Sequence, residues 1–209
     1  MICLFSSKGG VGCSVSTAAL GLLSASHEPT LLVDLRGDLD EILGMPPAAE
    51  GLSDWFDVDA PSPDLLYRLE RPVTSDLALL PRGTCRRPAR ADRYRLLAQL
   101  LGTEARRVIV DVGTHGVAAA PILAEASTSL MVTRACYLAL AAARRSPAPD
   151  LVILIEEEGR ALGPQDVEAA VGAAIDVRLR WHRDVARAVD AGLLTARLPR
   201  PLRTLERVL

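Results

Sequence analysis

The sequence has few aromatic residues and no apolar run long enough to cross a bilayer. Aromatic residues make up 3% of its 209 residues, against 49% hydrophobic residues overall. The core must therefore consist mainly of Ala, Val, Leu and Ile, the usual material of buried parallel strands and their covering helices.

A membrane-spanning helix needs about 20 successive apolar residues, and the sequence contains no such run. Met1 leads straight into a strand-like stretch without the charged start of a signal peptide. We therefore expect a cytoplasmic protein for which membrane attachment is unlikely.

Paired cysteines are also missing. The four cysteines stand at positions 3, 13, 85 and 136, and no two of them have the spacing of a CxxC motif or another metal-binding pair. This excludes a disulfide framework and argues against an iron–sulfur carrier. We expect four reduced thiols.

Lysine is almost absent, because Lys8 is the only lysine among 24 basic residues. The net charge is −2, but arginines cluster in two segments. Residues 82–95 contain six arginines and one acid, and residues 176–209 contain eight arginines and four acids. Such clusters can bind non-specific DNA, although a solvated surface is the commoner explanation.

Short apolar runs alternate with helix-like stretches along the whole chain. Candidate strands lie at 2–5, 30–33, 77–80, 108–112, 130–133, 151–155 and 174–179. Candidate helices lie at 14–24, 91–101, 117–126, 137–145, 164–171 and 183–191. This alternation predicts an α/β fold in which a mostly parallel sheet carries helices on both faces. The length of the chain fits a single domain over 1–209.

The segment 46–74 interrupts this pattern. It is rich in Pro, Asp and Ser, and it is too long for an ordinary connection. We expect an irregular insertion that holds one short helix after Ser53. Its adjacent Trp55 and Phe56 are either an anchor for an unknown protein partner or a local plug on the core.

A glycine-rich loop follows the first strand directly. It reads Ser6-Ser7-Lys8-Gly9-Gly10-Val11-Gly12-Cys13-Ser14 and leads into a helix. Glycines allow backbone N–H groups to approach an anion, and the start of a helix attracts negative charge. The arrangement predicts a phosphate-binding loop formed by Gly9, Gly10, Val11, Gly12, Cys13 and Ser14.

The loop resembles the deviant Walker A motif KGGxGK[ST] of the ParA/MinD family, which Lys8, Gly9, Gly10, Gly12 and Ser14 match. The strand that ends at Asp34 resembles the family's second-strand motif, and the one that ends at Asp111 resembles its Walker B strand. The resemblance implies a P-loop NTPase fold, ATP and Mg²⁺ as cofactors, and Mg²⁺ ligands at Ser14, Asp34 and Asp111. It also implies a homodimer in which Lys8 reaches the partner's nucleotide.

Two departures from the motif concern catalysis. Cys13 replaces the lysine that bridges the β- and γ-phosphates, and a thiol cannot supply that cation. It is either a small neutral residue or a thiolate favoured by the helix N-terminus. Arg36 occupies the place of an acid that orients the attacking water, for which Asp38 or Asp40 could substitute. Lys8, Arg36 and Asp38 are therefore the candidate catalytic residues, and we expect weak or lost ATP hydrolysis.

Glu156 lies where family members often use an asparagine to read adenine, and an ionised carboxylate cannot donate that hydrogen bond.

The resemblance implies a protein that positions cargo or regulates through dimerisation. The alternative is a working ATPase in which Arg36 compensates for Cys13, and this alternative is favoured if Arg36 points to the phosphate loop.

At the C-terminus, Leu202, Leu205 and Leu209 share one side of a short helix, which we expect to pack on the domain.

Overall fold

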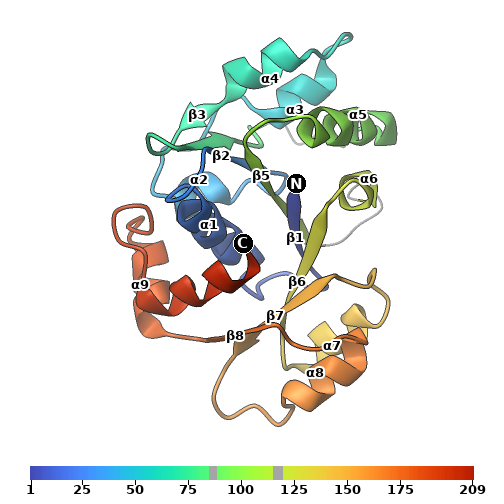
Figure 1. Ribbon diagram of the computed structural model, residues 1–209, viewed down its shortest axis with the longest axis vertical. Helices are drawn as coiled ribbons and strands as arrows, with labels where there is room; N and C mark the ends of the chain where they lie inside the picture. Colours follow the sequence, from blue (N-terminus) through green and yellow to red (C-terminus); the bar gives the residue numbers. More distant parts are fainter. Residues whose placement is uncertain (85–88, 115–119) are drawn as a thin grey trace.

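The computed structural model describes residues 1–84, 89–114 and 120–209. These residues form an eight-stranded sheet with helices on both faces (Figure 1). The strand order is β3-β4-β2-β5-β1-β6-β7-β8, and all pairings are parallel except that of β3 with β4. The predicted α/β architecture is confirmed.

The strands are β1 (Ile2–Ser6), β2 (Thr30–Asp34), β3 (Arg71–Pro72), β4 (Leu77–Leu80), β5 (Arg107–Thr114), β6 (Thr128–Arg134), β7 (Leu151–Glu156) and β8 (Val177–Arg180). All seven predicted apolar runs overlap a strand, but β3 was not predicted and β8 begins three residues later than expected. Because a buried parallel strand is covered on both faces, its run is continuously apolar and easy to recognise.

The helices are α1 (Cys13–Ser24), α2 (Leu39–Ile42), α3 (Leu52–Asp57), α4 (Pro63–Leu69), α5 (Ala91–Gly102), α6 (Ala120–Ala124), α7 (Tyr137–Ala143), α8 (Pro164–Val171), α9 (Arg183–Asp190) and the 3₁₀ helix η2 (Arg200–Val208). The predicted helices at 91–101, 164–171 and 183–191 are found within one residue of their expected ends. The first part of the helix predicted at 117–126 lies outside the described residues.

Successive strand residues face opposite sides of the sheet and so divide the core in two. Leu4 and Leu32 pack with α1 and η2, whereas the next residues, Phe5 and Val33, pack with α3, α5 and α6. Figure 1 shows α1 and α9 on one side of the sheet and α5 and α6 on the other. The sheet is thereby buried on both faces, and the carboxyl ends of its strands remain available for a site.

The segment 46–74 is more ordered than the expected irregular insertion. It contains α3, α4 and β3, of which only the first helix was predicted. Trp55 is fully buried, and its indole N–H donates to the carbonyl of Ser62 at 2.9 Å. Phe56 packs against Trp55 and Tyr94. The two aromatics are therefore a plug on the core and not an exposed anchor for a partner.

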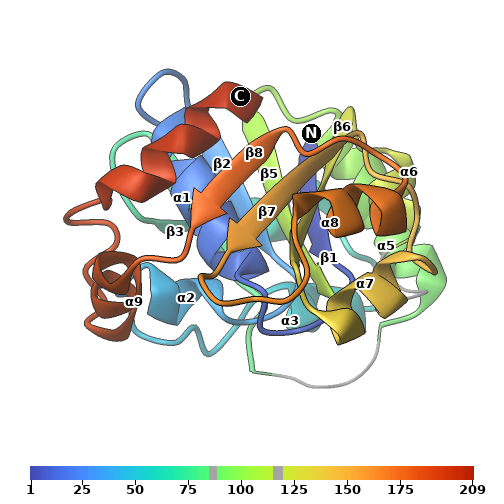
Figure 2. The ribbon, with the colours of Figure 1, turned by 90° about the horizontal axis from the view of Figure 1, so that it is seen from below.

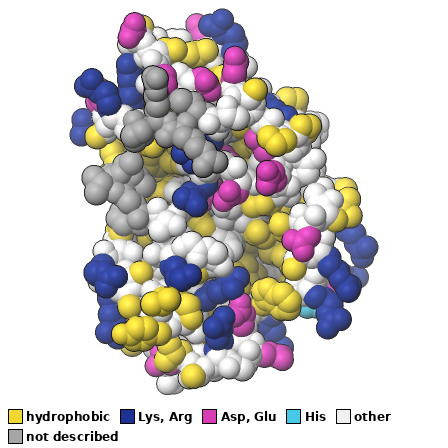
Figure 3. Space-filling model, turned by 180° about the vertical axis from the view of Figure 1, so that it is seen from behind, with side chains coloured by type: hydrophobic (Ala, Val, Ile, Leu, Met, Phe, Trp, Pro, Cys, Tyr) yellow, Lys and Arg dark blue, Asp and Glu magenta, His cyan; other side chains and the backbone are white. Residues whose placement is uncertain are grey.

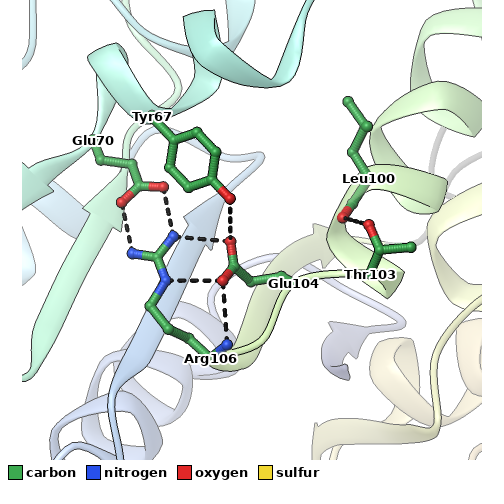
Figure 4. Close-up of polar contacts among 6 residues, drawn as sticks. All are labelled: Tyr67, Glu70, Leu100, Thr103, Glu104 and Arg106. Atoms are coloured by element: carbon green, nitrogen blue, oxygen red, sulfur yellow. Dashed lines mark hydrogen bonds and ion pairs between the residues drawn. The ribbon is translucent and has the colours of Figure 1, made fainter.

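An arginine between two glutamates ties this insertion to the start of β5 (Figure 4). The guanidinium of Arg106 donates to both carboxylate oxygens of Glu70, at 2.7 and 2.8 Å. It also donates to both oxygens of Glu104, at 3.1 and 2.9 Å. Bidentate pairs of this kind fix geometry as well as charge. The end of α4 is thus held against the sheet.

The C-terminal segment packs on the domain, as predicted for two of its three leucines. Leu202, Leu205 and Val208 are buried, while Leu209 is partly exposed. Figure 2 shows η2 lying across α1 and beside β8, and both contacts are present in the structure. None of the helices in the described ranges has the length and apolar character that crossing a bilayer requires.

Candidate functional site

The phosphate loop joins β1 to α1 at the carboxyl edge of the sheet. Gly10 and Gly12 have φ angles of 76° and 101°, which side chains other than glycine adopt only under strain. Gly12 caps α1, whose first turn contains no acidic residue. The first backbone N–H groups of a helix have no partner within the helix and attract anions. The loop therefore has the form expected of a phosphate cradle.

A cavity of 630 Å³ opens in front of this loop. It lies beyond the ends of β1, β2, β5 and β6, where the strand order changes direction and α/β proteins bind ligands. The residues that line it are Ser6, Gly9, Gly10, Gly12, Cys13, Ser14, Val15, Arg36, Asp38, Glu41, Ile42, Gly113, Thr114, Arg134, Val189, Asp190 and Gly192. The described residues thus place most of the predicted site around one cavity.

Asp34 organises the turn that follows β2. Its Oδ1 accepts hydrogen bonds from the backbone N–H groups of Arg36 and Gly37 at 2.7 and 2.6 Å. Its Oδ2 accepts one from Leu39 at 2.9 Å. Burial raises the pKa of this carboxyl, while the three hydrogen bonds favour its ionised form. Asp34 therefore holds the turn that carries Arg36 and Asp38.

Asp111 is the buried carboxylate beside it. The two residues are register partners in β2 and β5, and Asp111 is 0% exposed. Its Oδ1 accepts from the N–H of Gly113 at 3.0 Å, while no group in the described residues hydrogen-bonds its Oδ2. Burial raises the pKa of Asp111 to about 7, and the charge of Asp34 acts in the same direction, whereas the Ser14 hydroxyl, the Gly113 N–H and the Cys13 thiol favour the ionised form. An unpartnered buried oxygen is costly unless a ligand or cation satisfies it.

Cys13 is a neutral thiol directed at this carboxylate. Its Sγ donates to Asp111 Oδ1 at 3.6 Å. Burial, and secondly the Asp111 charge, raise the pKa of the thiol well above its ordinary value. Burial thus opposes the thiolate that a helix N-terminus can favour, which supports the interpretation of Cys13 as a small neutral residue. Cys3, Cys13 and Cys136 are free thiols, and Cys85 lies outside the described residues.

Two arginines line the cavity, and only one of them is paired. Arg134 forms an ion pair with Glu157 and donates to the carbonyl of Val11. Arg36 has no carboxylate partner among the described residues. Its methylenes lie so close to Gly113 that a side chain there would collide with them. Arg36 therefore extends along the β5 end of the cavity and leaves an uncompensated cation at its wall.

The acids after β2 separate into two roles. Asp40 is buried, pairs with Arg71 at 2.6 Å and accepts from the N–H of Ala48 at 3.0 Å. It is thereby removed from the candidates for orienting water. Asp38 is exposed at the start of α2 and lines the cavity together with Glu41. Glu41 stands three residues after Asp38, and this spacing on a helix was the only sign of it in the sequence.

Lys8 does not line this cavity. Its side chain is exposed, and its ammonium donates to the carbonyl of Gly9 at 3.2 Å. Ser7, its neighbour, donates to the carbonyl of Ala139 at 2.9 Å and fixes the loop to α7. The single lysine of the sequence thus lies on the exposed side of the phosphate loop, where its one hydrogen bond is to the loop itself.

A smaller, mainly apolar cavity of 150 Å³ adjoins the first, and the two share Gly12, Val15, Arg134, Val189 and Asp190. Its other walls include Ile155, Trp181 and Leu202, so it could hold a flat ring. Glu156, the predicted position for reading a base, does not line it, because its carboxylate accepts from Arg178 at 2.7 Å. Thr114, the last residue of β5, lines the main cavity, and the next residue, His115, lies outside the described residues.

Sequence reasoning missed Glu41 and Arg134. Arg134 ends β6 and faces the same cavity as the residues that end β1, β2 and β5. The carboxyl ends of parallel strands meet at one edge of the sheet, so Arg134 can be recognised as a site residue once the order of the strands is known.

No protein-family model and no curated protein sequence matches this chain. Solved structures do resemble it. A ParA family ATPase from Chlorobium tepidum TLS has a TM-score of 0.79 at 22% identity, over 98% of this chain and 95% of that one. The cell division ATPase MinD of Pyrococcus furiosus has a TM-score of 0.80 at 16% identity, over 99% and 97%. The septum site-determining protein MinD of Pyrococcus horikoshii OT3, complexed with Mg-ADP, has a TM-score of 0.78 at 16% identity, over 99% and 93%.

Proposed function

We propose that this chain, which has the fold of the ParA/MinD ATPases, is a nucleotide-binding positioning or regulatory protein that works through dimerisation and partner binding. The observation that carries the proposal is the cavity at the phosphate loop, with Arg36 as an unpaired cation in its wall. The neighbouring apolar cavity offers space for a base. Together they fit a nucleoside polyphosphate better than an uncharged small molecule.

Arg36 supplies the charge that Cys13 lacks. A guanidinium can donate two parallel hydrogen bonds to a phosphate, and it keeps its charge at all physiological pH values. Arg36 follows β2, whereas the motif lysine belongs to the phosphate loop. The two cations would therefore approach the phosphates from different sides. This position supports nucleotide binding despite the loss of that lysine.

The donors for a magnesium ion fit as well. Mg²⁺ is bound by one or two carboxylates together with phosphate oxygens and water. Asp111 has a buried oxygen without a hydrogen-bond partner, and Ser14 lines the cavity at the start of α1. We assign Ser14 and Asp111 as the residues that would hold the ion, with Asp34 as their support. The ion would neutralise phosphate charge.

Hydrolysis is the weaker part of the site. Arg36 stands where the family's motif has an acid, and a cation cannot accept a proton from water. Asp38, Glu41 and Asp190 are the carboxylates of the cavity wall that could orient water, and all three are exposed. We therefore propose slow or absent turnover. The orientation of Arg36 also favours the alternative of a working ATPase, which Asp38 or Glu41 would then complete.

Calorimetric titration with ATP, ADP and GTP, each with and without Mg²⁺, tests the proposal. We expect Mg²⁺-dependent binding of the adenine nucleotides, with turnover far below that of a ParA-type ATPase under the same conditions. Absence of binding by all three nucleotides would exclude the nucleotide role. Turnover equal to that of the reference enzyme, and lost in Asp38→Ala, would establish the alternative.

Cys13→Lys should raise ATP affinity roughly tenfold or more without restoring turnover. A lysine there adds a cation beside Asp111 and the phosphates, and a charge-assisted hydrogen bond contributes about 1.5–3 kcal/mol. Water orientation depends on other residues and stays as it is. Cys13→Ala is the matched control, because it removes the thiol without adding charge. Equal affinities of the lysine and alanine variants would contradict the prediction.

Lys8→Ala should shift a nucleotide-bound dimer toward monomer while the fold stays intact. Its exposed ammonium makes no contact with another element of its own subunit in the described residues, and an anion at the interface would need its charge. Sedimentation of wild type and of Lys8→Ala, with and without Mg²⁺-ATP, measures the effect. Lys8→Arg tests whether a compact ammonium is required. A dimer population that is the same in all three proteins would show that Lys8 has no role across the interface.

Non-specific DNA remains a proposed partner for the arginine-rich C-terminal segment. Arg187, Arg197, Arg200 and Arg203 line a groove between α9 and η2, and none of them forms an ion pair within the described residues. Asp184 is the single acid in its lining. Unpaired arginines along a groove fit a phosphate backbone.

A further inference from the structure

The most exposed large apolar side chains of the described residues are neighbours on one helix. Tyr137 and Leu138, in the first turn of α7, are 76% and 63% exposed. Trp55, which the sequence offered as a partner anchor, is buried instead. Scattered exposed apolar residues are normal, but adjacent ones at the edge of a groove indicate an interaction site.

Tyr137 forms one wall of a groove between α7 and α8. The groove has a volume of 330 Å³, and its apolar lining consists of Leu140, Ala141, Leu162 and Ala169. Beneath it, Leu140 packs with Val167 and Ala170, so both walls are fixed to the core. A rigid apolar groove of this size can take one or two large side chains from a partner.

The rim of the groove is positively charged. Arg144 and Arg145, at the end of α7, line it and are exposed, and neither has an acidic partner in the part of the chain that the structure describes. Asp166 also lines it, but its carboxylate accepts from the N–H of Gly163 at 2.8 Å and caps α8. Figure 3 shows hydrophobic side chains gathered beside Lys and Arg side chains at the lower left, over α7 and α8.

We propose that this groove, here called the α7–α8 groove, binds an acidic amphipathic segment of a protein partner. The partner would insert apolar side chains against Tyr137 and Leu140 in the groove, cover the neighbouring Leu138, and place carboxylates on Arg144 and Arg145. This is the helix-in-groove mode of recognition, and Tyr and Arg are the residue types enriched at energetically dominant contacts.

Other occupants fit the groove less well. A two-fold axis through this patch would bring the arginines of both copies toward one another, and like charges oppose a self-complementary interface. A nucleic acid would meet only two cations beside an apolar floor, too few for backbone binding. The groove also shares no lining residue with the nucleotide cavity, so its occupancy does not depend on the proposed nucleotide function.

A displayed library of random 16-residue peptides, selected on the full chain and depleted on Tyr137→Ser, tests the proposal. We expect enriched peptides to combine Leu, Ile or Phe at helical spacing with Asp or Glu. Fluorescence anisotropy of the best synthetic peptide should show at least tenfold weaker binding to Tyr137→Ser and to Arg144→Glu/Arg145→Glu, and weaker binding at high salt. All substituted side chains are exposed, and circular dichroism verifies the fold of each variant.

The matched controls are Leu193→Ser and Arg197→Glu, which change an exposed leucine and an exposed arginine far along the chain. They should leave peptide binding unchanged. Enrichment of basic or uncharged peptides, no enrichment at all, or equal binding to every variant would overturn the proposal. Sedimentation of Tyr137→Ser covers the remaining occupant, because loss of a wild-type dimer in this variant would assign the groove to a second copy.

Discussion

Arg36→Ala should lose ATP affinity by roughly 10- to 100-fold, the effect of removing a charge-assisted, bidentate contact of about 1.5–3 kcal/mol. Arg36 is the cation of the cavity wall that no carboxylate in the described residues neutralises, whereas Arg134 is already paired with Glu157. Without it, Asp34, Asp38, Glu41 and Asp111 leave the surroundings of the phosphates negative. Calorimetry with Mg²⁺-ATP measures the loss directly.

Three further variants define what Arg36 does. Arg36→Lys keeps the charge but not the planar pair of donors, so it should bind ATP with intermediate affinity. Gly113→Ala should also weaken binding, because the new methyl group collides with the Arg36 side chain and Gly113 has a φ of 70°. Arg144→Ala, in the α7–α8 groove, which shares no lining residue with either nucleotide cavity, should have no effect. If Arg36→Ala binds ATP as the wild type does, another group neutralises the phosphates and the compensation hypothesis is wrong.

The fold was predictable because its main signals are local. Buried parallel strands such as β4 and β7 are continuous apolar runs bounded by polar residues, and they were found almost to the residue. The glycine loop marks the β1–α1 junction in the same direct way. The insertion 46–74 was not resolved by this reasoning, because β3 has two residues and forms only by pairing with β4. Its order depends on tertiary contacts, such as Arg106 with Glu70, which no local pattern reveals.

The site was predictable by position but not by interaction. Strand ends located Asp34, Asp111 and Arg36 at one edge of the sheet, and the structure gathers them there. The sequence could not show that Asp40 pairs with Arg71, or that Glu156 pairs with Arg178. Nor could it show that Cys13 lies against Asp111, where burial raises the pKa of the thiol. Each of these facts depends on residues distant in sequence, so the assignment of roles needed the structure.

Asp111→Asn should stabilise the ligand-free protein at pH 8 and abolish Mg²⁺-dependent nucleotide binding. Burial raises the pKa of Asp111 to about 7, against 3.8 for the ordinary group. The folded state therefore favours the protonated carboxyl, and the stability this brings is lost as the pH rises from about 4 to about 7. Above that range the wild type holds a buried charge with one unpartnered oxygen. The amide removes this charge, for a gain of about 2 kcal/mol or roughly 4–8 °C in Tm.

Asp34→Asn is the matched control, since it makes the same chemical change in the adjacent, equally buried residue. Burial raises the pKa of Asp34 too, but its oxygens accept three backbone hydrogen bonds. An amide nitrogen in place of Oδ2 would face the N–H of Leu39, so one bond is lost and two donors oppose each other. We expect a lower Tm for this variant at pH 8 and a higher one for Asp111→Asn, with the gain shrinking at pH 5. Thermal unfolding of both variants at pH 5 and pH 8 tests this prediction. Equal stabilisation of the two variants would contradict it, because the removal of buried charge, and not the unpartnered oxygen of Asp111, would then control stability at this site.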